Sequence, residues 1–376
     1  METPYRYVDD DDQLAELAAE LGSEPLLGAD TEAAGYHRYR DTVALLQLST
    51  PEKTVLVDPL AVSGLAPLGP LFARPGSEII FHDADYDLRL LDRDAGITVS
   101  NLFDTQVAAA FLGSRRLGLD AVLKEFLGLS IPKKFQRADW AERPLSREMK
   151  AYAATDTAHL PTLRNRLRDR LEQRGRLSWA EQEFALRART RWSGEKDGPA
   201  YLRLKGARDL PPRGLAVLRE VYAWREGVAE SLDRAPFRVT SNDALLALAA
   251  TPPRTPPALR SLRAVPGRLA EERSSEILAA VGRALEVPEN ELPGFPRGPR
   301  RERNPEGEAA VERMRRARGE RAGELGLDPG FLISRAVLAE VAARGPSTPD
   351  ELTEVPGVRR WQVEAAGAAL LGALKG

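Results

Sequence analysis

The spacing of apolar residues changes once along this chain of 376 residues, near position 104, and the change limits the possible folds. Before that point, four short apolar runs are bounded by turn residues, which is typical of buried strands. They span residues 26–30, 43–48, 54–57 and 78–81. After it, apolar residues recur every three or four positions almost throughout, which predicts helices. We therefore expect an α/β domain followed by all-helical segments.

Two polar breaks divide the helical part of the chain. Residues 193–199 and 288–307 are rich in Gly, Pro and charged residues, which indicates exposed linkers. The pattern LxxVPG occurs at 262–267 and again at 352–357, each time between two predicted helices. VPG alone is a common helix-ending turn, but the matching flanks favour a duplicated helical domain. We predict domains at 1–192, 205–287 and 309–376, with linkers at 193–204 and 288–308.

The composition excludes several kinds of chemistry. The chain has no cysteine and only three histidines, so disulfides, thiolate catalysis and cysteine metal sites are excluded and a His-rich zinc site is disfavoured. Any metal would be a hard cation bound by carboxylates. No apolar stretch approaches the roughly 18 residues that span a membrane, and no secretory signal is visible. We therefore expect a cytoplasmic protein with no membrane partner.

The formal net charge of −2 conceals a segregation of charge along the chain. Residues 1–100 carry 19 acidic and 7 basic side chains, residues 101–300 carry 25 and 35, and the remainder carry 12 of each. Arg, the better bidentate phosphate ligand, supplies 46 of the 54 basic residues. A codon bias explains the preference for Arg but not the segregation of sign. The basic middle of the chain is thus compatible with a polyanionic partner.

Acidic residues mark the ends of two predicted strands. Asp30 and Glu32 end the first apolar run, and their spacing places both carboxylates on one face of a strand, where they could share a divalent cation. Asp87 follows the fourth run, one turn inside a helix that we expect to begin near Asp83, which is too late for a cap. Most such carboxylates are solvated, so neither pattern is specific by itself.

A third pair of polar residues lies on a late predicted helix. Tyr152 and Asp156 are four residues apart, so a helix would place them on one face, one turn apart. The alternative is a core tyrosine beside a surface aspartate. The order of the three patterns is more specific than any one of them. It runs D-x-E on a first strand, Asp at a strand-to-helix junction, then Y-x-x-x-D on a late helix.

This order resembles the DEDDy family of 3′→5′ exonucleases and, within it, ribonuclease D. Residues 103–113 are similar to a helix of that family. Residues 119–128, Lys133 and residues 137–145 are similar to the segment that leads into its third motif. Residues 210–267 resemble an HRDC domain, and the segment after 308 resembles a more divergent repeat of it. The resemblance implies a ribonuclease H-like mixed sheet flanked by helices, followed by two small all-α HRDC-type domains.

The resemblance also implies a mechanism. It is hydrolysis of phosphodiester bonds from a 3′ end, with two divalent cations, magnesium or manganese, and release of 5′-mononucleotides. Asp30 would bridge both cations, Glu32 and Asp156 would complete the first site, and Asp87 would act at the second. Tyr152 would hold the attacking water beside the first cation.

Substrate contacts follow less directly from the sequence. Lys133 and Arg137 stand at family positions near the active site and could contact RNA, with ordinary surface charge as an equal alternative. Helices of the first HRDC-type domain carry further basic residues that could contact phosphate, namely Arg203, Lys205, Arg208, Arg213, Arg219 and Arg225. An alternative is that one helical domain binds RNA and the other packs on the exonuclease domain. The second, without excess positive charge, is the better candidate for packing.

The substrate that the resemblance implies is RNA with a free 3′ end, namely transfer RNA precursors, acted on by a monomer. The nearest alternative is a 3′→5′ DNA exonuclease in repair, because the same metal site cleaves either sugar. A third hypothesis is a nucleic-acid-binding protein whose nuclease domain is vestigial. The complete set of five residues argues against that third hypothesis.

Overall fold

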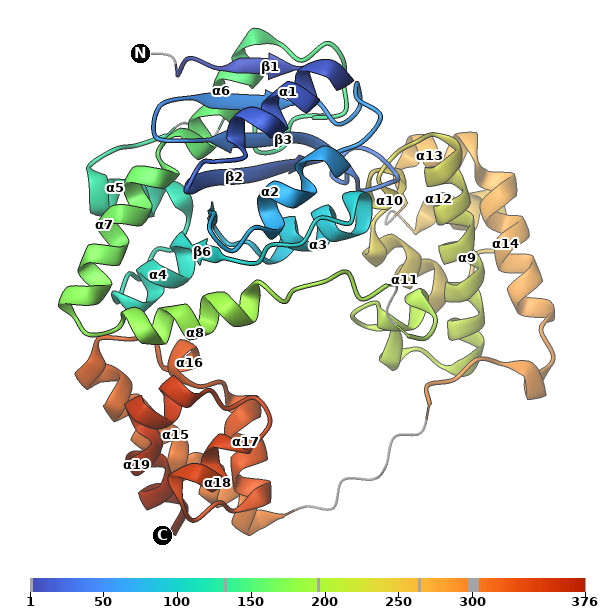
Figure 1. The fold of residues 1–376 in the computed structure, drawn as a ribbon. Coiled ribbons are helices and arrows are strands. Elements are labelled where there is room, and N and C mark those ends of the chain that lie inside the picture. Colours follow the sequence, from blue (N-terminus) through green and yellow to red (C-terminus); the bar gives the residue numbers. More distant parts are fainter. Residues whose placement is uncertain (1–2, 132–133, 195–196, 263–264, 297–303, 376) are drawn as a thin grey trace.

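The computed structural model describes residues 3–131, 134–194, 197–262, 265–296 and 304–375. Its first part is built on a mixed sheet of six strands in the order β1-β4-β3-β2-β5-β6 (Figure 1). The strands are β1 (Arg6–Val8), β2 (Leu26–Ala33), β3 (Val43–Ser49), β4 (Thr54–Val57), β5 (Glu78–Phe81) and β6 (Leu102–Asp104). The predicted strands are β2 to β5, and the predicted mixed sheet is confirmed. The edge strands β1 and β6 escaped prediction.

The pairing of β2 changes along its length, and this change opens one edge of the sheet. One edge of β2 pairs with antiparallel β3 from Gly28 to Ala33, with Asp30 opposite Gln47. Its other edge pairs with parallel β5 only over residues 26–28. Beyond that point the edge has no strand partner in the described part of the chain. The carboxyl ends of β2 and β5 therefore border a crevice of the kind that binds ligands in open α/β sheets.

Helices cover both faces of the sheet. They are α1 (Asp11–Leu21), α2 (Gly69–Ala73), α3 (Asp85–Ala95), α4 (Thr105–Phe111), α5 (Leu119–Leu127), α6 (Arg147–Ala158), α7 (Leu160–Gln173) and α8 (Leu177–Arg187), with a 3₁₀ turn η1 (Ala66–Leu68). Asp10 caps α1 by accepting the Gln13 backbone N–H at 2.8 Å, as a run of aspartates before a helix leads one to expect. Helix α6 packs on β2, β3 and β4.

Two helical units follow this α/β domain. The first contains η2 (Ala200–Arg203), η3 (Ala207–Asp209), α9 (Pro212–Ser231), α10 (Pro236–Val239), α11 (Asn242–Ala250), α12 (Pro256–Ser261), α13 (Gly267–Glu272), α14 (Ser274–Glu286) and η4 (Glu289–Glu291). The second contains α15 (Pro305–Leu325), α16 (Pro329–Leu332), α17 (Arg335–Arg344), α18 (Pro349–Thr353) and α19 (Arg360–Lys375). No helix in the described ranges is long and apolar enough to cross a membrane.

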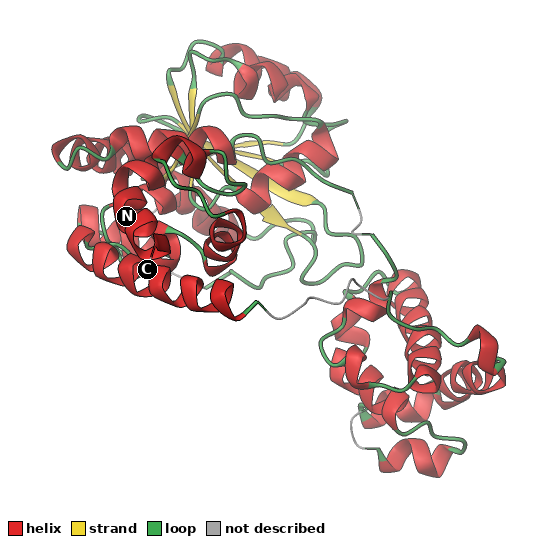
Figure 2. Cartoon of the chain, turned by 90° about the horizontal axis from the view of Figure 1, so that it is seen from below, coloured by secondary structure: helices red, strands yellow, loops and turns green. Residues whose placement is uncertain are grey.

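The first helical unit has a core of its own, formed where α9 packs against α11 and α14. Tyr201, which the sequence placed in a linker, is buried in this core. The unit touches the α/β domain at loop 34–42, which follows β2. There Arg38 lies 3.4 Å from Asp233, and Tyr39 packs against the small apolar cluster around Val228. Figure 2 shows this unit standing apart from the rest of the molecule.

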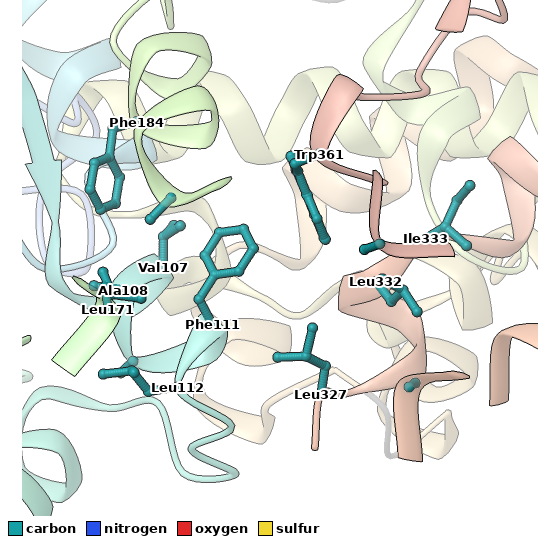
Figure 3. Packing of buried hydrophobic residues seen from close by; sticks show 14 of the residues in the cluster. Val107, Ala108, Phe111, Leu112, Leu171, Phe184, Leu327, Leu332, Ile333 and Trp361 are labelled. Atoms are coloured by element: carbon teal, nitrogen blue, oxygen red, sulfur yellow. The ribbon is translucent and has the colours of Figure 1, made fainter. Parts of the chain in front are cut away.

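The second helical unit shares a hydrophobic core with the α/β domain. Trp361 of α19 is only 1% exposed, and its ring centroid lies 4.8 Å from that of Phe111 in α4 and 5.8 Å from that of Trp179 in α8. Figure 3 shows Leu327 and Leu332 of the second unit on the same side of Phe111 as Trp361. The sequence had indicated this second unit as the better candidate for packing on the α/β domain.

Candidate active site

A cavity of about 530 Å³ lies at the free edge of β2. The residues that line it include the five predicted as catalytic, which are Asp30, Glu32, Asp87, Tyr152 and Asp156. They come from β2, α3 and α6, so the fold brings together residues that are up to 126 positions apart in the sequence. Arg137 is not among the lining residues, and Lys133 lies outside the described residues.

Close packing of helix on sheet places the α6 pair beside the β2 pair. Gly28 shares a strand face with Asp30, and a Cβ at Gly28 would lie 3.1 Å from the Leu160 side chain and 3.2 Å from the Thr157 carbonyl oxygen. The hydroxyl of Ser49, on the neighbouring strand β3, lies 2.6 Å from the hydroxyl of Thr157 in α6. A small residue and a buried hydrogen bond thus hold the end of α6 against the sheet.

Helix α3 places Asp87 against the free edge of β2. The Asp87 Oδ1 accepts the Thr31 backbone N–H at 3.1 Å and the Thr31 hydroxyl at 2.5 Å. The carboxylate therefore occupies the position on this edge that a longer β5 would have taken. The sequence alone did not single out Thr31. Its position between Asp30 and Glu32 was the available signal, because successive side chains of a strand point to opposite faces.

A single buried carboxylate, Asp104, fixes the start of α3. It caps α4 through two backbone N–H groups at 2.9 and 3.1 Å. It also accepts the backbone N–H groups of Asp83 and Ala84, directly before α3, at 3.2 and 3.0 Å. The Arg187 guanidinium of α8 donates to the same carboxylate at 2.8 Å. The position of Asp87 therefore depends on α4 and α8 as well as on its own helix.

Burial raises the pKa values of all four carboxyl groups, and repulsion from the neighbouring carboxylates adds to the rise at Asp30 and Glu32. Burial, followed by the charges of Asp87, Asp156 and Glu32, raises the pKa of Asp30 well above its ordinary value. Burial and then the charges of Asp156 and Asp87 do the same to the pKa of Glu32. Burial raises the pKa of Asp87 and that of Asp156 to about 7. The cavity therefore concentrates negative charge that it does not itself neutralise.

The chemistry of this donor set fits a hard divalent cation. Carboxylate oxygens are the ligands that magnesium and manganese prefer, and a bound cation would turn the repulsion among the four groups into attraction. Histidine and cysteine play no part in the set. In the described ranges, no group of three or more His, Cys, Asp or Glu side chains is already arranged to hold a metal ion.

Tyr152 is held as a neutral hydroxyl beside these carboxylates. Burial and then the neighbouring negative charges raise its pKa, so the phenol stays protonated near neutral pH. Its ring contacts Phe135 edge-on, with centroids 5.7 Å apart, and lies 6.2 Å from the ring of Trp140. The segment that carries both rings is anchored by Arg143, which donates twice to the Asp58 carboxylate at 2.6 Å.

Gln47 is a second residue that the sequence reasoning missed. It is fully buried and pairs directly with Asp30, and opposed residues in antiparallel strands share a face with Cβ atoms about 5 Å apart. Neither amide atom of its side chain has a hydrogen-bond partner in the described structure. A glutamine inside an apolar run was the available signal, because a buried amide needs a partner.

The structure corrects the expected role of two arginines in the first helical unit. Arg225 is 4% exposed and its guanidinium contacts Glu226 at 2.9 Å and Asn242 at 2.7 Å. Arg213 donates to backbone carbonyl oxygens at the end of α14, including that of Ala284 at 3.2 Å. Both guanidinium groups therefore stabilise the unit internally, and neither is presented to a phosphate.

Comparison with known proteins agrees with this arrangement. Residues 5–172 match a 3′-5′ exonuclease family, and residues 214–281 and 307–374 each match the HRDC domain. The chain is 32% identical over 365 residues to a ribonuclease D from Nitrobacter hamburgensis, covering 96% of this chain and 92% of that one.

Two solved structures match nearly the whole chain. One is an Escherichia coli RNase D, 25% identical, with a TM-score of 0.72 and 99% of each chain covered. The other is a protein from Bifidobacterium adolescentis, 26% identical, with a TM-score of 0.81, covering 99% of this chain and 97% of that one. The likeness thus extends over the α/β domain and both helical units.

Proposed function

The chain belongs to the ribonuclease D family of 3′→5′ exoribonucleases, and from that premise we propose that it trims transfer RNA precursors with two divalent cations, magnesium or manganese. One observation carries the proposal: four carboxylates and one neutral tyrosine converge in a single cavity at the free edge of β2. The Escherichia coli relative is described as an exoribonuclease involved in structured RNA processing, which supports a structured RNA substrate.

The carboxylates would divide between the two proposed cations. Asp30 would contribute to both sites, Glu32 and Asp156 would complete the first, and Asp87 would serve the second. When bound, the cations supply positive charge that polarises the phosphate and stabilises the departing 3′ oxygen. Thr31 keeps Asp87 in place through the two hydrogen bonds that it donates.

The role of Tyr152 follows from its protonation. A phenol whose pKa is raised is a poor base near neutral pH, so Tyr152 does not remove the proton from water. Its Oη atom instead holds the attacking water by a hydrogen bond and fixes its direction of approach. The rings of Phe135 and Trp140 fix the position of that oxygen.

The test is trimming of a 3′-extended transfer RNA by the full chain with magnesium or manganese, beside single-stranded DNA of equal length. We expect RNA to shorten one nucleotide at a time, and Asp30→Asn and Asp156→Asn to lose at least about 100-fold in rate. Asp12→Asn, which changes an exposed aspartate of α1, is the matched control and should retain full activity.

Each other outcome assigns a different function. Faster trimming of DNA than of RNA would make the chain a DNA exonuclease. Tight binding of either nucleic acid without metal-dependent cleavage would leave a binding protein. For Tyr152→Phe we expect kcat to fall while RNA affinity stays near the wild-type value, and an unchanged kcat would remove the hydroxyl from the mechanism.

A further inference from the structure

Two aromatic side chains meet where the α/β domain touches the first helical unit, and both remain exposed. Tyr36 lies in loop 34–42 and Phe237 in α10, and their ring centroids are 5.4 Å apart at 57°. Tyr36 is 40% exposed and Phe237 is 52% exposed. A contact that served only to join two domains would be stabilised most by burying both rings. Exposed aromatic rings at such a place indicate a binding surface.

Two guanidinium groups flank this aromatic pair. The guanidinium carbon of Arg238 lies 5.1 Å from the centroid of the Tyr36 ring, and that of Arg137 lies 6.0 Å from it. Arg238 donates to the Tyr36 carbonyl oxygen at 2.9 Å and contacts the His37 ring at 3.3 Å, and neither partner is a carboxylate. Aromatic faces beside cationic side chains are the combination that binds single-stranded nucleic acid, by base stacking and phosphate attraction together.

The cluster adjoins the candidate active site on two sides. Arg137 directly follows Gln136, which lines the cavity. Tyr86 also lines the cavity, and its hydroxyl donates to Asp41 of loop 34–42 at 2.5 Å. The loop itself continues from the end of β2 that carries Glu32. A nucleic-acid strand whose 3′ end occupies the cavity therefore passes this aromatic and cationic cluster at the rim of the cavity.

Other contacts hold the boundary between the two domains, so the boundary does not need the open ring faces. The Ala235 backbone N–H donates to the His37 carbonyl oxygen at 3.0 Å. Arg38 reaches Asp233 at 3.4 Å, and Tyr39 supplies the apolar contact. About half of the Phe237 side chain remains exposed and available to a ligand, whereas the guanidinium groups of Arg238 and Arg137 lie over the Tyr36 ring.

We propose that Tyr36, Phe237, Arg137 and Arg238 form a binding site for an unpaired RNA base and its neighbouring phosphate, at the rim of the cavity. The proposal rests on the proposed function, because it takes RNA as the substrate. The base stacks on an exposed ring face and the guanidinium groups contact phosphate, so binding tolerates any of the four bases. Helix α10 thereby makes the first helical unit part of substrate recognition.

The test measures binding of a 12-nucleotide single-stranded RNA to the full chain by fluorescence anisotropy. EDTA is present, so binding is read without metal-dependent cleavage. Phe237→Leu keeps an apolar side chain but removes the stacking face, and we expect Kd to rise about tenfold. Phe237→Trp should restore the wild-type Kd. Leu60→Ala, which shortens an apolar side chain that is 48% exposed and does not belong to the cluster, should bind as the wild type does.

A set of RNAs with one abasic nucleotide each locates the stacked base. We expect one position at which the missing base weakens binding to the wild type about tenfold and binding to Phe237→Leu less than twofold. A structural role for Phe237 would not produce this loss of additivity. Arg238→Gln is a second, independent variant, and it should lower the salt dependence of log K by roughly 0.7 for each phosphate that the guanidinium neutralises in the wild type.

A Kd for Phe237→Leu within twofold of the wild type would overturn the proposal. Equal losses in both proteins at every abasic position would overturn it as well. The trimming assay decides the proposed function separately. Absence of trimming together with a clear loss of additivity at one position would remove the proposed function and keep the stacking site.

Discussion

The two helical units match the same domain family, yet they attach to the α/β domain in opposite ways. The second unit contributes Trp361 to a core that it shares with Phe111 and Trp179, so packing of these three rings stabilises both parts at once. The first unit has a separate core and touches the α/β domain through loop 34–42. A duplicated domain has therefore become a structural support in one copy and a separately folded unit with a small contact surface in the other.

The largest expected effect concerns the shared core. Trp361→Ala should lower the free energy of unfolding by about 3–5 kcal/mol, as expected for removal of a buried tryptophan. The destabilisation should extend to the sheet, because Trp361 packs directly against α4 and α8. Calorimetry combined with hydrogen exchange at β2 and β3 measures both quantities.

Trp224→Ala is the matched control in the first unit, where Trp224 of α9 packs against the core of that unit and its indole N–H donates to Glu276 of α14 at 2.9 Å. It should destabilise that unit and leave exchange in β2 and β3 near the wild-type rate. If both tryptophan variants accelerate exchange in the sheet equally, the contrast between the units is wrong.

Arg187→Met tests whether the support given by the second unit reaches the active site through α8. The substitution leaves the Asp104 carboxylate buried without its ionic partner, which should cost about 3 kcal/mol. Because Asp104 also holds the residues before α3, we expect kcat to fall with stability. Arg189→Met, at the next basic position, serves as a control in the same assays, and a stable but inactive Arg187→Met would separate the two effects.

The pH dependence of the free energy of unfolding reports on the carboxyl groups of the cavity and does not depend on how either helical unit is attached. The folded-state pKa values of Asp87 and Asp156 are raised to about 7, so the folded protein binds more protons than the unfolded chain between about pH 4 and pH 7. Without metal, the free energy of unfolding should therefore fall as pH rises through this range, by on the order of 1 kcal/mol per pH unit. Urea titrations in EDTA measure the slope, and Asp87→Asn should reduce it. A slope that is flat or positive contradicts the raised pKa values.

The smallest expected effect concerns the attachment of the first unit. Asp233→Ala removes an exposed ion pair with Arg38 and should change stability by less than about 1 kcal/mol. Limited proteolysis of the chain between α8 and α9 is the sensitive measurement, because it reports release of the unit from loop 34–42. A loss of several kcal/mol would place the first unit in the same class as the second.

The sequence predicted the strands with long apolar runs and the residues that meet in the cavity, for identifiable reasons. Residues 43–48 and 54–57 read as strands because both faces of the central sheet are covered and select apolar side chains. The strands β1 and β6 have three residues each, which is too few for an alternation of apolar and polar side chains to be recognised. The spacing of Asp30 and Glu32 fixed their common face, and the spacing of Tyr152 and Asp156 fixed theirs.

What the sequence could not predict depends on tertiary contacts. The hydrogen bonds from Thr31 to Asp87 arise only because β5 ends early, and the length of a pairing is not visible in one strand. Arg225 resembled a surface cation, but packing of α9 buries it. Lys133, predicted to contact substrate, lies outside the described residues, and that prediction stands untested.

The first helical unit is attached to the molecule at both ends. The chain enters it from α8 and returns to α15, and both of these helices belong to the shared core. Tethering converts its contact with loop 34–42 into an intramolecular association, with an effective concentration on the order of millimolar. Contacts too weak to hold a free domain are then sufficient to keep this unit docked on loop 34–42, where α10 can take part in the proposed RNA site.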